Sequence, residues 1–363
     1  MNKYETKIVG SDRVATIEIG ADVEDTYFKF PQQVMAQIVD ALHNNDKVVL
    51  EFIEGVALEE LNYKEKKFLQ ILKELCEDNG WPMEKISFVL PNLVQDKSVW
   101  PLIEYGNAPI MSHNMDANYL LQLQVNKYPK PEKNIQKTFG NFIHRSQWDR
   151  VMLSSYLYEN YKDISMQTFR MDPTVPGQMV EMDLDQLFWQ VSAYNGQLIN
   201  TKFKQVQNLI EHLPLEQGVK YLDIVNVKTA ADQTIMSWYN NIFLDIVCEK
   251  TITGQTFFPT EKIARPLATK TPFLIMAAPN YIKNLKRLNF RSFNRWWSED
   301  YDQQQGVQRI ESIQRIIDDL AKLDKKQLED MYQQMQTIVE YNYKTYMEIT
   351  PEKIHEVFSQ EII

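Results

Sequence analysis

Cysteine and long apolar runs are scarce in this chain. The 363 residues include only two cysteines, Cys76 and Cys248, and each lies in an apolar pattern typical of a small buried side chain. We therefore expect neither a disulfide framework nor a cysteine-based metal site, and this cysteine usage is typical of the reducing cytoplasm. No window approaches the 18 apolar residues of a membrane-spanning helix, and no apolar signal-peptide core opens the chain. The sequence predicts a cytoplasmic protein, in the host cytoplasm if it is viral, without a membrane span.

An excess of basic residues is also absent. Against 39 Lys and Arg stand 49 Asp and Glu, so the formal net charge at pH 7 is −10. Non-specific binding to nucleic acid or to an acidic membrane is therefore not expected as the main activity. One local basic cluster lies beside Trp296 and Trp297, and is interpreted either as solvated surface or as a groove that steers an anionic ligand. Its members are Lys283, Lys286, Arg287, Arg291 and Arg295.

The first part of the chain has the pattern of a β-α-β unit. Residues 47–54 and 85–91 have strand patterns, and between them residues 61–77 carry apolar side chains on one helical face up to Gly80. This order predicts an α/β domain with parallel pairing over residues 1–130. The proline-bearing segment 127–133 is typical of a linker between domains.

The last sixty residues have the pattern of helices. One apolar stripe begins at Ile310 and a second at Leu328, both with helical spacing. We expect these stripes to be core. The predicted organisation is then an α/β domain over 1–130, a second α/β domain over 136–303, and C-terminal helices over 304–363 that pack back on the first domain.

The most informative stretch begins at Thr260. Its hydroxyl suits the N-cap of a helix, and Glu261 and Lys262 then fall in the first turn, beside free N–H groups that favour anions. The apolar run 273–277 follows as a buried parallel strand. Because ligands of open α/β sheets bind where strands end and helices begin, a glutamate for a ribose hydroxyl and a lysine for a phosphate are plausible here. The alternative is a surface helix whose first turn is charged.

Upstream, the buried-strand pattern 242–248 ends in Glu249, and about ten residues then lead to Thr260. This order resembles the sugar-nucleotide-binding half of GT-B glycosyltransferases, most closely the fucosyltransferase type and its uncharacterised virus-encoded and bacterial relatives. In those families a strand ending in an acidic residue leads through a Thr-Glu-Lys helix start to an apolar strand opened by proline, which is Pro272 here.

A second block agrees with the first. Residues 137–146 have the pattern of a strand running into a turn, and Ser146 with Asp149 has the spacing of a capping box at a helix start. Arg145 and Arg150 flank that start, where backbone N–H groups and a guanidinium together suit a diphosphate. The alternative for Arg150 is a solvated helix residue. His144 is either a hydrogen-bonded turn histidine or a catalytic base.

The resemblance covers residues 137 to about 300 and implies a fold of two Rossmann-like domains with a helical C-terminal tail. It implies a metal-independent enzyme with no cofactor, whose substrates are a nucleotide sugar and an acceptor hydroxyl of unknown identity on a glycan, a protein or a DNA base. Glu249 would orient the donor, and Glu261 would hold the ribose. The candidate donor-binding residues are Arg145, Arg150, Glu249, Thr260, Glu261, Lys262 and Arg265.

The general base and the acceptor side are not identified by any motif. His113 and Asp116 lie in an irregular loop and, with His144, are the candidate catalytic residues. The one Asp-X-Asp, at 183–185, opens a helical pattern, so we interpret it as N-capping and not as a metal site. Two alternatives stay open, namely a glycosyltransferase acting on DNA or a modified base, and a binding or assembly protein that keeps the fold without catalysis.

Overall fold

The structure is a computed structural model that divides into two compact units, described separately. Unit 1 comprises Met1–His113, Thr253–Phe258 and Thr350–Ile363, and unit 2 comprises Asn114–Ile252 and Pro259–Ile349. The structure describes residues 4–19, 32–52, 58, 61–63, 66–90, 93–94, 97–105, 133–143, 148–169, 204–213, 215, 238–249, 252–350, 353–354 and 356–357.

Unit 1 is built on a five-stranded mixed sheet of order β1-β2-β3-β6-β8. Its strands are β1 (Glu5–Val9), β2 (Asp12–Ile19), β3 (Lys47–Phe52), β6 (Ile86–Leu90) and β8 (Ile103–Tyr105). The pairs from β2 to β8 are parallel, and β1 joins β2 as an antiparallel hairpin. The predicted β-α-β unit with parallel pairing is therefore confirmed.

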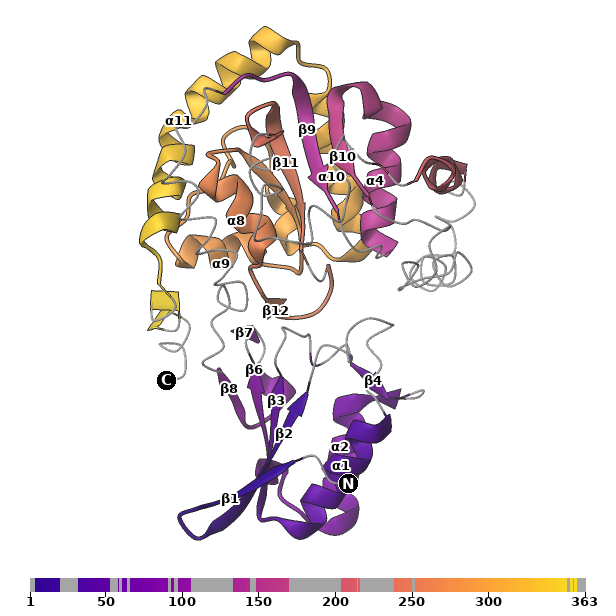
Figure 1. Cartoon of the computed structure of the whole chain (residues 1–363), viewed down its shortest axis with the longest axis vertical. Helices are drawn as coiled ribbons and strands as arrows, with labels where there is room; N and C mark the ends of the chain where they lie inside the picture. Colours follow the sequence, from indigo (N-terminus) through magenta and orange to yellow (C-terminus); the bar gives the residue numbers. More distant parts are fainter. Residues whose placement is uncertain are drawn as a thin grey trace. The chain divides into compact units, whose positions relative to one another are not determined.

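Two helices of unit 1, α1 (Gln32–Asn44) and α2 (Phe68–Asn79), pack with the sheet in one apolar core (Figure 1). Burial alternates along β3, so Val48 and Leu50 lie in that core while Lys47 and Glu51 are exposed. The α2 helix begins later than its apolar pattern suggested, because two short strands that pair antiparallel, β4 (Asn62–Tyr63) and β5 (Lys66–Lys67), precede it. A further short pair joins β7 (Leu93–Val94) to β12 (Thr256–Phe257).

Unit 2 contains a four-stranded sheet of order β10-β9-β11-β13 in which all pairs are parallel. The strands are β9 (Lys137–Phe142), β10 (Ser165–Thr168), β11 (Ile242–Cys248) and β13 (Phe273–Met276). Every residue of β11 and β13 is buried, as expected for parallel strands covered on both faces. The predicted α/β class is confirmed in both units.

The helices of unit 2 cover this sheet (Figure 1). Among them are α4 (Trp148–Tyr161), α8 (Glu261–Ala268), α9 (Tyr281–Arg287), α10 (Gly306–Leu320) and α11 (Lys325–Glu348). The α10 helix packs on α4 and β13, and α11 packs on α8. The short 3-10 helix η6 (Asp300–Gln303) connects α9 to α10.

The C-terminal helices depart from the expected arrangement. The stripe of Ile310, Ile313 and Ile317 is buried as predicted, and α10 packs on β13 of the unit 2 sheet. Helices α10 and α11 belong to unit 2, and only residues 350–363 are grouped with unit 1. The physical reason is that Arg309 of α10 is fully buried and donates to the Ile275 carbonyl of β13, which fixes α10 to the sheet of unit 2.

Candidate functional site

The carboxyl end of β11 is organised by Glu249, the first residue after the strand. Glu249 is 2% exposed, and its two oxygens accept hydrogen bonds from Thr260 and Tyr281. The Thr260 amide donates to Oε1 at 3.2 Å, the Thr260 hydroxyl to Oε2 at 2.6 Å, and the Tyr281 hydroxyl to Oε1 at 2.8 Å. Glu249 therefore ties the starts of α8 and α9 to the end of β11.

Thr260 is the N-cap of α8, as the sequence predicted. Its backbone is extended, and its Oγ1 accepts the amide of Lys262 at 3.2 Å. The Lys262 ammonium donates to the same oxygen, also at 3.2 Å, and its side chain is half-buried. Glu261 is the first residue of α8. The positive end of the α8 helix dipole and the Lys262 ammonium therefore lie together near the carboxyl end of β11. This arrangement suits the binding of an anionic group.

Arg150 lies in the first turn of α4 and is buried. Its Nη2 donates to the carbonyl oxygen of Glu249 at 2.8 Å. The guanidinium therefore links α4 to the end of β11, which is a positioning contact. Next to it, Asp149 is also buried, and burial raises the pKa of its carboxyl although the Arg150 charge and the amides of Asp149 and Arg150 oppose that shift.

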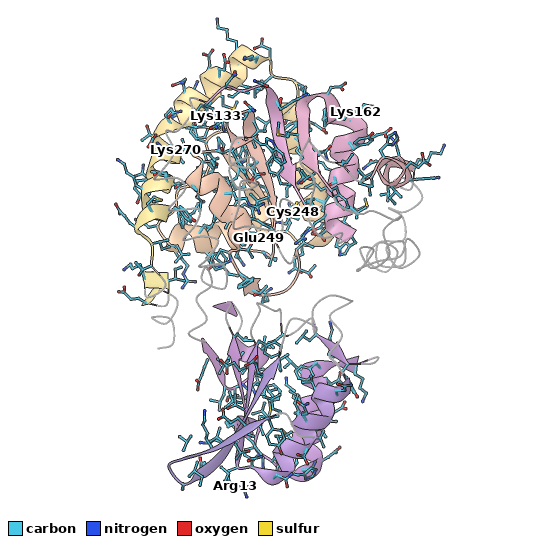
Figure 2. All side chains as sticks on the ribbon, viewed as in Figure 1. Arg13, Lys133, Lys162, Cys248, Glu249 and Lys270 are labelled. Atoms are coloured by element: carbon cyan, nitrogen blue, oxygen red, sulfur yellow. The ribbon has the colours of Figure 1, made fainter. Side chains whose placement is uncertain are left out.

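The thiol of Cys248 is enclosed in the same region (Figure 2). Burial raises the pKa of this thiol to about 12, so it is protonated at neutral pH and is a poor nucleophile. Asn141 of β9 approaches it at 3.5 Å, donates to the Ile246 carbonyl at 3.0 Å, and accepts from the Ser154 hydroxyl of α4 at 2.9 Å. Both cysteines are free and buried, as predicted.

The end of β13 is held by a charged pair that sequence reasoning missed. Arg309 is completely buried, and its Nη2 donates to Asp302 Oδ1 at 3.1 Å and to the Ile275 carbonyl at 3.3 Å. The Asp302 carboxylate also accepts the amides of Ile282 and Lys283 at 3.0 and 3.1 Å. These amides open α9, so the first turn of that helix is already capped. Asp302 lies 7 residues before Arg309, and 20 and 19 residues after the two amides, so no local sequence pattern marks these contacts.

Arg265 belongs to a different buried polar cluster, with Lys133, Tyr239 and Asp245. The Tyr239 hydroxyl donates to Asp245 Oδ2 at 2.8 Å, and the Lys133 ammonium donates to the Tyr239 carbonyl at 2.7 Å and to Thr271 Oγ1 at 2.9 Å. The Arg265 charge lowers the pKa of Tyr239 and Asp245, against the larger effect of burial. Arg265 was predicted to bind the donor, whereas here it interacts with the cluster.

Figure 2 separates the two groups within unit 2. Lys133 lies toward the end of the sheet where the strands begin, and Glu249 and Cys248 lie where β11 finishes. The structure therefore brings together Arg150, Glu249, Thr260 and Lys262 of the predicted donor-binding residues, with Glu261 at the start of the same helix. Arg145, the candidate catalytic residues His113, Asp116 and His144, and the Asp-X-Asp at 183–185 lie outside the described residues.

The basic cluster near Trp296 and Trp297 is largely engaged within unit 2. Lys286 forms an ion pair with Glu299 at 3.0 Å, and the Arg291 guanidinium lies 3.7 Å from the centre of the Tyr341 ring. Trp297 is buried, and Trp296 is half-buried. Trp297 therefore belongs to the core, and the half-buried Trp296 packs beside Phe293.

No protein-family model matches the chain, and no curated protein matches it. In the part of the chain that the structure describes, no three His, Cys, Asp or Glu side chains gather as a metal site would require. Among the described helices, none is both long and apolar enough to cross a membrane.

Proposed function

We propose that the protein is a glycosyltransferase of GT-B type, which transfers a sugar from a nucleotide-sugar donor to a hydroxyl acceptor. Unit 2 would be its donor-binding domain. The observation that carries this proposal is the bonding of Glu249, Thr260 and Lys262 at the carboxyl end of β11. It supports the proposal because it holds a capped helix start and a lysine at the edge of a parallel sheet where nucleotides bind.

The chemistry of transfer fits these groups. When the sugar leaves, negative charge develops on the diphosphate, and cations and N–H groups held in place beforehand stabilise that charge. In the proposed enzyme, Lys262 and the first amides of α8 interact with the diphosphate, and Glu261 binds the ribose. Arg145 is a further proposed phosphate ligand. No divalent metal is required in this scheme.

Two predicted ligands take a different role in the proposal. The Glu249 carboxylate and the Arg150 guanidinium are buried and bonded to protein groups. Both are therefore positioning residues, which fix α4 and α8 relative to the end of β11. The general base that removes the acceptor proton is not assigned, and His113, Asp116 and His144 are its candidates.

The proposal is tested by a thermal-shift screen of the whole chain against nucleotide sugars, free nucleotides and inorganic phosphate. Binding to the folded state raises the melting temperature, by an amount that grows with ligand concentration over Kd. We expect one nucleotide sugar and its free nucleotide to stabilise the protein more than phosphate does. If no nucleotide or nucleotide sugar does so, the proposal is overturned and the binding or assembly alternative is favoured.

A DNA-directed glycosyltransferase is the second form of the proposal, and it differs only in the acceptor. The engaged cations and buried Trp297 of the basic cluster give it little support. Binding to duplex DNA that weakens as salt rises would favour this form over a glycan or protein acceptor.

A further inference from the structure

The first strand of the chain lies at the edge of the unit 1 sheet. In the described part of the chain, β1 pairs with β2 on one side and no strand pairs with its other side. All five residues of β1 are exposed, and Ile8 and Val9 are 78% and 61% exposed. Figure 1 shows the β1–β2 hairpin extending from the sheet. An exposed edge strand with apolar side chains is a template for pairing with another strand.

The hairpin register fixes which backbone groups of β1 point outward. Arg13 of β2, opposite Ile8, donates its amide to Asp46 Oδ2 at 2.8 Å, and its carbonyl accepts the Asp46 amide at 2.9 Å. Both backbone groups of Arg13 therefore point away from β1. Because backbone direction alternates along a strand, Ile8 does not bond to β2, and its amide and carbonyl point outward.

The same alternation applies along the strand. Glu5, Lys7 and Val9 bond toward β2, while Thr6 and Ile8 present their backbone groups at the free edge. Tyr4, immediately before β1, continues this outward set. Only registers that place outward residues opposite one another can add a strand here.

We propose that β1 is a self-association strand, which pairs antiparallel with β1 of a second copy of this chain and places Thr6 opposite Thr6 of that copy. In this register Glu5 of each copy lies opposite Lys7 of the other, and Tyr4 lies opposite Ile8. The two sheets join into one continuous sheet across a two-fold axis. Such an isologous contact is the commonest way in which two identical chains associate.

Charge complementarity selects this register. A shift of the second copy by two residues in one direction places Lys7 opposite Lys7. A shift by two residues in the other direction places Glu5 opposite Glu5. Like charges directly opposite destabilise a pair of strands, while opposite charges stabilise it. The two side chains already form an exposed ion pair within one copy at 3.0 Å, with 69% and 68% exposure for Glu5 and Lys7. Pairing gives each of them a second partner of opposite charge.

The apolar residues fit the same register. Ile8 would be covered by Tyr4 of the second copy, whose hydroxyl is held by Asp40 at 2.6 Å. Thr6 donates to Asn45 Oδ1 at 3.4 Å, so its side chain lies on the α1 side of the sheet with Tyr4. The paired strands are short, and we therefore expect a dimer that forms reversibly with concentration.

The first test is sedimentation velocity of the full chain over a wide concentration range, beside the variant Thr6→Pro. Proline removes the one outward amide at the two-fold axis and leaves the bonds of β1 to β2 in place. We expect a monomer–dimer equilibrium for the unsubstituted chain and its loss in Thr6→Pro, with unchanged circular dichroism. A chain that is monomeric at every concentration, or a dimer that is unaffected by Thr6→Pro, overturns the proposal.

The second test uses charge reversal and does not depend on proline. Glu5→Lys and Lys7→Glu each place like charges in both cross-strand pairs, and each should weaken self-association by roughly two- to thirtyfold. Mixing the two variants restores opposite charges in both pairs, so a mixed dimer should form in preference to either homodimer. One variant is uniformly labelled with nitrogen-15, so that native mass spectrometry of the mixture distinguishes the three species by mass. A mixture without preference for the mixed dimer shows that this register is wrong.

Discussion

The hydroxyl of Thr260 donates a 2.6 Å hydrogen bond to the carboxylate of Glu249, and the same oxygen accepts the amide of Lys262. One side chain thus serves as the cap of α8 and as its attachment to the end of β11. The carboxylate in turn accepts the Tyr281 hydroxyl at the start of α9. The buried side chain of Glu249 therefore fixes the positions of the starts of α8 and α9, and the geometry of the candidate site depends on it.

Replacing Glu249 by glutamine should destabilise unit 2. The change keeps the size of the side chain but removes the charge that strengthens the bonds from Thr260 and Tyr281. Hydrogen bonds to charged groups contribute about 1.5–3 kcal/mol, so we expect a loss of about 1–3 kcal/mol in the free energy of unfolding, measured with urea. The matched control is Glu340→Gln on α11, a more exposed carboxylate paired with Lys270, which should cost less than about 1 kcal/mol.

Replacing Arg309 by methionine should cost more. It leaves the Asp302 carboxylate, which is 9% exposed, without its cationic partner, and breaking a buried ion pair typically costs about 3–5 kcal/mol. Arg315→Met, an exposed position on the same helix, is the control and should change the free energy of unfolding little. Equal effects of the two substitutions would show that the Asp302 contact does not hold the end of β13.

The elements around this site follow from local patterns in the sequence. The run 242–248, apolar except for Asp245, predicts a buried parallel strand, and β11 occupies those residues. Thr260 predicts a helix cap because its hydroxyl acts on an amide two residues away, and α8 begins immediately after it. Such signals depend on a few neighbouring residues, so they can be recognised without knowing the fold.

The contacts between elements could not be predicted in the same way. Arg150 on a helix start has the pattern of a phosphate ligand, yet its guanidinium bonds to the Glu249 carbonyl, 99 residues away in the sequence. Lys133 appears in the sequence as a linker lysine, yet it lies beside Asp245. Both cases depend on which helix covers which strand, and that is decided by packing over the whole unit.

The stability of unit 2 should depend on pH through Asp245. Burial raises the pKa of this carboxyl from 3.8 to about 7, although Tyr239, Arg265 and Lys133 favour its charged form. Between about pH 4 and 7 the folded state therefore holds a proton that the unfolded state has lost, and this contribution to stability falls as pH rises. Asp245→Asn removes the titration. The free energy of unfolding of this variant, minus that of the unsubstituted protein, should therefore increase between pH 4 and pH 8. The increase should be on the order of a few kcal/mol.

Tyr239→Phe is the companion variant for this titration. The Tyr239 hydroxyl donates to Asp245 at 2.8 Å and lowers the pKa of that carboxyl. Its removal should therefore raise this pKa further, and the upper end of the pH window should move to higher pH. Urea unfolding at half-unit intervals of pH measures both variants. A constant difference between Asp245→Asn and the unsubstituted protein across this range would contradict the raised pKa.

Removing divalent metal should leave donor binding intact. The groups proposed to contact the diphosphate are Lys262 and the amides of α8, and neither needs a bridging ion. Calorimetry against the best donor, with Mg²⁺ and with EDTA, should give affinities that agree within about threefold, below the tenfold change that 1.4 kcal/mol produces. If EDTA abolishes binding and Asp185→Ala does the same, the enzyme is metal-dependent and the proposed mechanism is wrong.

Lys262→Ala and Glu261→Ala should each weaken nucleotide-sugar binding without unfolding the protein. A charge-assisted hydrogen bond contributes about 1.5–3 kcal/mol, so the affinity should fall about ten- to a hundredfold in either variant. The two variants should differ with simpler ligands. Lys262→Ala should also weaken the binding of inorganic phosphate. Glu261→Ala should leave phosphate binding unchanged, because phosphate has no ribose for Glu261 to contact.

The control for both variants is Lys283→Ala on α9. The first turn of α9 is already capped by Asp302, so this substitution should not change the affinity for the nucleotide sugar. Calorimetry gives the affinities, and circular dichroism confirms the fold. Unchanged binding in both variants would show that the Thr-Glu-Lys turn is an ordinary helix start that does not bind the donor.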